Sequence, residues 1–145
     1  IVDAHTVLWV DLGGSGIETI AHLRENGRIT LMFCAFEGRA NILRIYGQGE
    51  AVTMDDPGFD ALLALFPKFE RARAIVKINI SSVSDSCGWG VPFYEFKEDR
   101  EQLNRYIEHQ SLETWKQHRY EGNGQSIDGL PGLRRPDLKD KAQSS

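Results

Sequence analysis

The chain has 145 residues, 41% of them hydrophobic and 26% charged, a composition typical of one globular domain with a real core. The net charge of −4 at pH 7 argues against a nucleic-acid partner, and the lack of a long apolar run argues against a membrane span. Two cysteines and four scattered histidines form no metal-binding pattern, so we expect no metal site and a reducing, cytoplasmic compartment.

The first part of the chain predicts a strand, a glycine turn and a short helix. Residues 7–10 (VLWV) are bulky and apolar, which suits a half-buried strand. Glycines at positions 13, 14 and 16 free the backbone for a turn. Ser15 and Glu18 have the spacing of a capping box, in which each side chain bonds the other residue's amide. Asn26-Gly27 is a typical helix end.

The turn and the helix start allow two interpretations. A glycine turn that leads into a helix leaves amides free at the positive end of the helix dipole, which suits a phosphate. The same residues also describe a well-capped connecting helix. The glycines alone favour this second interpretation, because their spacing is a weak signal.

Two long strands are expected next, over residues 28–37 and 41–54, joined by a short turn as an antiparallel hairpin. Apolar side chains on both faces of the first strand predict burial on both sides, or on one side and against a partner chain. In the second strand, Gly47 and Gly49 predict a bulge or bend.

The rest of the chain predicts a helix, a strand and two further helices. Asp56-Pro57 is a standard helix start, and Pro67 ends or kinks that helix. Residues 74–83 predict a strand. Trp89, which lies between two glycines, fits two roles equally well: covering a planar ligand or plugging a hydrophobic seam. Residues 99–110 and 111–121 predict amphipathic helices with these inward side chains: Leu103, Tyr106, Ile107, Leu112 and Trp115.

The order β-α-β-β-α-β followed by helices predicts a mainly β (α+β) fold. Strands in hairpin relation with helices at the connections suit a small antiparallel barrel with peripheral helices, not a parallel doubly wound sheet. We expect a single domain over residues 6–133 and a polar C-terminal tail over residues 134–145.

Three motifs resemble a known family. VLWVDLGGSGIETIAHLRENGRITLMFCAFEG is similar to the pyridoxamine 5'-phosphate oxidase-related FMN-binding split-barrel family. SCGWGVP (residues 86–92) and SIDGLPGL (residues 126–133) resemble an FMN-binding branch of it whose substrates are mostly unassigned. The resemblance implies a six-stranded antiparallel split β-barrel, usually a homodimer with FMN held between subunits. Because the family has two strands before this point, we expect this chain to lack its first two strands.

The resemblance also implies the cofactor-binding residues. The end of the first strand would lie beside the flavin ring, and the turn and helix start would lie near the ribityl phosphate; the residues are Trp9, Val10 and Asp11, then Ser15, Gly16 and Thr19. Oxidases of the family carry Arg-Lys at the helix start to hold the phosphate. This chain has Glu18 and Thr19 there instead.

The leading hypothesis is an FMN-binding oxidoreductase-like protein of unassigned substrate and electron donor, in which the flavin carries the chemistry. No histidine or carboxylate stands in a catalytic arrangement, so no catalytic residue is predicted. For Asp11, a buried, hydrogen-bonded role is favoured over an acid–base role. The alternatives are a non-enzymatic flavin-carrying or interaction domain, which the Glu18-Thr19 departure favours, and a relative that uses a deazaflavin.

Overall fold

The computed structural model describes residues 1–69 and 71–136. Most of the predicted polar tail, residues 137–145, therefore lies outside the described residues. In the described part of the chain, no helix is long and apolar enough to cross a membrane. The elements in chain order are β1 (Thr6–Asp11), α1 (Glu18–Asn26), β2 (Arg28–Cys34), β3 (Ile42–Thr53), α2 (Phe59–Leu63), β4 (Ala74–Ser86), α3 (Gln102–Glu108) and α4 (Leu112–Gly122).

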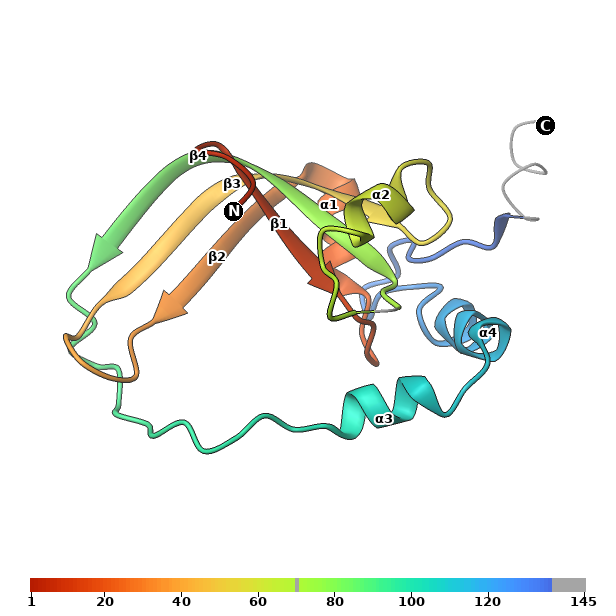
Figure 1. The fold of residues 1–145 in the computed structure, drawn as a ribbon. Helices are drawn as coiled ribbons and strands as arrows, with labels where there is room; N and C mark the ends of the chain where they lie inside the picture. Colours follow the sequence, from red (N-terminus) through yellow and green to blue (C-terminus); the bar gives the residue numbers. More distant parts are fainter. Residues whose placement is uncertain (70, 137–145) are drawn as a thin grey trace.

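The four strands form one antiparallel sheet in the order β1-β4-β3-β2. The sheet curls into a half-barrel, with the helices around it (Figure 1). The predicted mainly β (α+β), split-barrel-like fold class is confirmed. β2 and β3 form the predicted hairpin, and β4 runs to Ser86, three residues beyond the predicted end of that strand.

The bulge predicted at Gly47 is confirmed by the register shift between Tyr46 and Gly47, although the extra residue, Ser81, lies on the paired strand β4. A Cβ atom at Gly47 would lie 2.7 Å from the Cγ2 atom of Ile78 and would collide with the Asn79 carbonyl oxygen. Only glycine fits this close approach of two strands. The extra residue increases the local twist, which contributes to the curl of the sheet.

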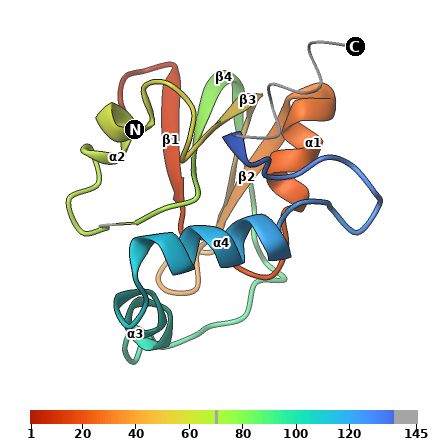
Figure 2. The same cartoon turned by 90° about the vertical axis from the view of Figure 1, so that its right-hand side faces the viewer.

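The buried side chains form two clusters. The first lies between α1 and the sheet and contains Val7, Leu23, Ile45, Val76 and Ile78. The second joins all four helices to the end of the sheet, with Trp115 of α4 only 2% exposed. Figure 2 shows α1 beside the sheet and α4 running across one end of the molecule. These clusters place the end of β1, the glycine turn and α4 at one end of the fold.

The start of α1 differs from the prediction. The helix begins at Glu18 after Ile17, and no side chain caps it, so the predicted capping box of Ser15 and Glu18 is wrong. The Glu18 carboxylate instead accepts a hydrogen bond from the distant amide of Ile127. The predicted end is confirmed, because Gly27 has a left-handed φ of 70° and its amide bonds the Leu23 carbonyl.

The start of α2 also differs. Asp56 does not cap the helix; its carboxylate accepts hydrogen bonds from the amide and hydroxyl of Thr53 at 2.8 and 2.6 Å. α2 begins only after Gly58, whose φ is 85°. The aspartate is used to close the turn after β3, and this delays the helix.

The exposed apolar side chains correct several burial predictions. The chain itself does not bury both faces of β2, since Met32 is 59% and Phe33 53% exposed. Trp89 is 86% exposed and plugs no seam in the described part of the chain. In α3 and α4, Ile107 and Trp115 point inward as predicted, whereas the other three predicted inward residues are about half exposed: Leu103, Tyr106 and Leu112. α3 is shorter than predicted, whereas α4 has the predicted length and lies one residue further along the chain.

Candidate cofactor site at the glycine loop

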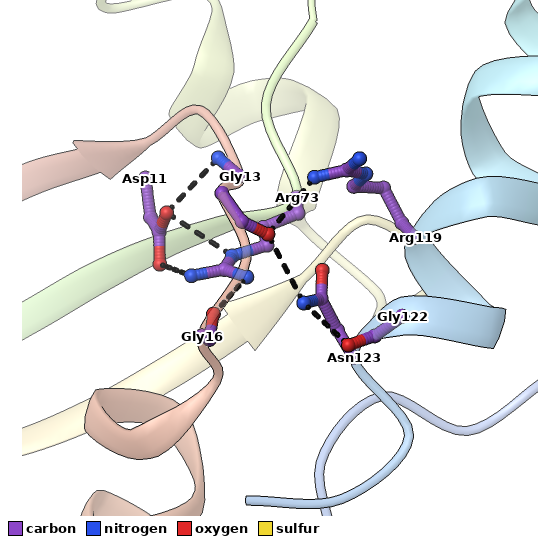
Figure 3. Close-up of polar contacts among 8 residues, drawn as sticks. Asp11, Gly13, Gly16, Arg73, Arg119, Gly122 and Asn123 are labelled. Carbon is purple, nitrogen blue, oxygen red and sulfur yellow. Dashed lines mark hydrogen bonds and ion pairs between the residues drawn. The ribbon is translucent and has the colours of Figure 1, made fainter.

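The loop over residues 12–16, between β1 and α1, is held in place through its carbonyl groups. Arg73 donates from Nη1 to the Gly16 carbonyl at 2.5 Å. Arg119 and Asn123 donate to the Gly14 carbonyl at 3.0 and 3.1 Å, as Figure 3 shows. Because a trans peptide places each carbonyl opposite the following amide, the amides of the two following residues, Ser15 and Ile17, point away from these donors.

Asp11 and Arg73 form a buried ion pair beside the loop. Nε and Nη2 of Arg73 each lie 3.1 Å from a different carboxylate oxygen of Asp11, and the two side chains are 8% and 12% exposed respectively. The Gly13 amide donates to the same carboxylate at 3.1 Å (Figure 3). The favoured interpretation of Asp11 as a buried, hydrogen-bonded aspartate is confirmed. Its oxygens are committed to holding the loop.

Glu18 lies across the start of α1. Its Oε1 accepts from the Ile127 amide at 3.1 Å, and its Oε2 lies so close to Gly16 that a Cβ there would collide with it. Hydrogen bonds from its own backbone amide, then from the amides of Ile127 and Ile17, lower the pKa of the Glu18 carboxyl, and His22 adds a smaller Coulombic effect. The carboxylate is therefore charged at neutral pH.

The SIDGLPGL motif forms a compact turn that packs on α1. The Ser126 hydroxyl bonds the Asp128 carboxylate, and the Leu130 amide bonds the Ser126 hydroxyl at 3.0 Å. Asp128 also contacts Nε2 of His22 on α1 at 2.9 Å. Arg24 of α1 donates to the Gly132 carbonyl. The motif thus joins the C-terminal part of the chain to the helix that follows the glycine loop.

The contacts of Asp128 with Ser126 and His22 predict that the stability of the folded protein depends on pH. The Ser126 hydroxyl first, and then His22, lower the pKa of Asp128 below its ordinary value of 3.8. A carboxyl with a lowered pKa stabilises the folded state above its ordinary pKa, and this contribution is lost as the pH falls through the lowered value. We expect Asp128→Asn to be less stable than the wild type near neutral pH, with the difference closing as the pH falls below about 3.8.

Urea unfolding at a series of pH values would test this expectation. Asp99→Asn, which removes an exposed aspartate elsewhere, is the matched control and should leave the pH profile unchanged. If Asp128→Asn lowers the free energy of unfolding by the same amount at all pH values, the negative charge of Asp128 does not have the stabilising role assigned to it.

The structure brings most of the predicted cofactor residues to one end of the half-barrel. Asp11, Ser15, Gly16 and Thr19 surround the loop and the start of α1, and Ser15 is exposed. Trp9, 40% exposed, lies on the same face of β1 as Asp11, because alternate strand residues share a face. Val10 points to the opposite face and packs against the core cluster, so only its backbone is directed at the loop side.

Sequence reasoning missed Arg73, Arg119 and Asn123, which hold the loop. No local pattern marks them, since they lie 57 to 109 residues from the carbonyls that they contact. The pairing of β1 with β4 would have found Arg73. Asp11 lies opposite Ala74 in that register, and the residue before Ala74 then lies beside the carboxylate.

The loop fits a flavin phosphate only in part. Nε of Arg119 and Oδ1 of Asn123 are buried and have no hydrogen-bond partner among the described residues, which suits a polar group with an acceptor and a donor. The Asp11 carboxylate neutralises the charge of Arg73. It does not compensate the charge of Arg119. The Glu18 carboxylate at the start of α1 opposes a second anion. Across the residues that the structure describes, no cluster of His, Cys, Asp or Glu suits a metal ion.

A curled antiparallel sheet, with a glycine loop leading into a helix at one end, defines a split-barrel-like protein. The chain is 32% identical, over an alignment of 158 positions, to the pyridoxamine 5'-phosphate oxidase family protein ustO of Aspergillus flavus. The alignment covers 99% of this chain and 63% of that relative. This similarity supports the predicted pyridoxamine 5'-phosphate oxidase family. No family model matches the chain.

Proposed function

We propose that this chain is an FMN-binding, oxidoreductase-like member of its family, with an unassigned substrate. The observation that carries the proposal is the similarity to a family protein along nearly the whole chain. The chain spans 63% of the length of that relative, so the activity of the whole protein is part of the proposal. A bound flavin would supply the redox chemistry, and the chain would supply position and electrostatics.

The proposed cofactor residues lie along one path at the end of the half-barrel. The ring would lie along the end of β1, beside Trp9 and the backbone of Val10. The phosphate would lie near Ser15, Gly16 and Thr19. Asp11 acts indirectly, because its ion pair with Arg73 holds the loop that these residues belong to.

We also propose a homodimer, in the cytoplasm. Several large apolar side chains are more than half exposed on β2 and on the segment after β4: Met32, Phe33, Trp89, Phe93 and Phe96. A second copy of the chain that covers them would remove this surface from water, which is favourable by about 25 cal/mol per Å² of apolar area. Sedimentation of the purified protein would test this, and a monomer at all concentrations would contradict it.

Titration of the purified protein with FMN, followed by quenching of flavin fluorescence and by desalting, tests the cofactor proposal. We expect saturable binding of one FMN per chain. Trp9→Ala should weaken it, and Leu65→Ala, which removes an exposed apolar side chain after α2, should not. No retained or saturable flavin in the wild type would refute FMN binding.

A non-enzymatic flavin carrier is the second candidate. One observation favours it: the carboxylate at the end of β1, Asp11, is paired with Arg73 and so is not free to transfer protons. Reduction of bound FMN by NADPH, followed by electron transfer to an acceptor over many turnovers, would exclude a carrier. Binding without turnover would support it.

A further inference from the structure

We propose that Glu18 is a specificity-determining residue, which acts as an internal anion at the start of α1 and lowers the preference of this chain for phosphorylated over unphosphorylated flavin. The inference rests on the proposed flavin function and deepens it. It concerns the charge of the ligand that this end of the half-barrel accepts.

The Glu18 carboxylate is held at the glycine loop by contacts from two parts of the chain. The Glu18 side chain folds back over Gly16 and accepts a hydrogen bond from the Ile127 amide at 3.1 Å. That amide comes from a segment 109 residues further along the chain. Two separate parts of the chain therefore converge on this one carboxylate and hold it over the glycine loop.

The Glu18 carboxylate would compete with a ligand phosphate for the start of α1. A phosphate at a helix start is held by the free backbone amides there and by the positive end of the dipole. The Glu18 carboxylate already occupies this position: its Oε2 lies so close to Gly16 that a Cβ there would collide with it, and hydrogen bonding to backbone amides lowers its pKa. A ligand phosphate must therefore displace the carboxylate or bind beside a like charge, and both weaken its binding.

The basic side chains near the loop are engaged with other groups. Arg73 and Arg119 donate to the carbonyls of Gly16 and Gly14, on the side of the loop away from its outward amides. His22 of α1, the other basic side chain near this helix start, has its Nε2 engaged with Asp128 at 2.9 Å. The described hydrogen bonds of these side chains go to the loop carbonyls and to the carboxylates of Asp11 and Asp128.

Riboflavin and FMN differ only by the phosphate, so the ratio of their dissociation constants isolates its contribution. We expect the wild type to bind the two with similar affinity. Glu18→Gln keeps an acceptor for Ile127 and removes the charge; it should bind FMN about tenfold more tightly and leave riboflavin affinity unchanged. Glu25→Gln, an equal charge change at an exposed position of α1, is the matched control and should keep the wild-type ratio. Glu18→Ala is a second variant with the same expected direction.

The outcomes separate this inference from the proposed function. A strong wild-type preference for FMN, or a ratio that does not change in Glu18→Gln and Glu18→Ala, would overturn the role of Glu18 and leave flavin binding intact. If no variant binds either flavin, the proposed function fails. Thermal unfolding with inorganic phosphate then decides the inference: stabilisation of the Glu18 variants but not of the wild type supports it, and equal responses overturn it.

Discussion

Replacing Arg73 by alanine is expected to destabilise the protein by about 3–5 kcal/mol, the cost of leaving a buried carboxylate without its partner. The Asp11 side chain is only 12% exposed, and Arg73 meets both of its oxygens at 3.1 Å. The substitution also removes the hydrogen bond to the Gly16 carbonyl. Urea unfolding monitored by tryptophan fluorescence would measure the loss.

Two comparisons make the Arg73 result specific. Arg39→Ala, at an exposed arginine in the turn after β2, should change the free energy of unfolding by less than about 0.5 kcal/mol. The double variant Asp11→Asn/Arg73→Ala should be more stable than Arg73→Ala, because it no longer buries an unpaired charge. A loss below about 1 kcal/mol for Arg73→Ala, the level of a surface ion pair, would contradict the buried pair.

Trp115→Ala is expected to cost about 3–5 kcal/mol, the usual range for removing a large aromatic side chain from a core. Trp115 is 2% exposed and belongs to the cluster that ties α4 to α1, α2 and the end of the sheet. Loss of this anchor should also weaken any ligand binding at the glycine loop, because α4 carries Arg119 and is followed by Asn123.

Leu112→Ala is the matched control for Trp115, since it lies on the same helix and is 50% exposed. We expect it to change stability by less than about 0.5 kcal/mol. Thermal unfolding of both variants, with the free energies compared at one temperature, would distinguish them. Equal effects would mean that α4 does not dock through Trp115.

Local residue patterns were sufficient to predict most of the sheet. The apolar strands, the β2–β3 hairpin and the bulge at Gly47 follow from side-chain type and from glycine, and so does the end of α1 at Gly27. Each depends on neighbours a few residues away, where sterics and backbone freedom decide the conformation. The resemblance of three motifs indicated the family, which the relative in Aspergillus flavus supports.

The starts of α1 and α2 were predicted wrongly because long-range or competing partners took the capping groups. Ser15-x-x-Glu18 fits a capping box, yet the Glu18 carboxylate bonds the amide of Ile127. Asp56 fits a helix cap, yet it closes the turn at Thr53. A local cap contributes only about 1 kcal/mol, so packing can redirect it.

By itself, then, the sequence determined most of the strands and the antiparallel half-barrel class. Only the tertiary structure decided what holds the glycine loop and what charge surrounds it. Asp11 meets Arg73 across 62 residues, and Glu18 meets Ile127 across 109 residues. The physical reason is that strand pairing and core packing choose such partners, and hydrogen bonds between distant residues leave no periodic mark in a sequence.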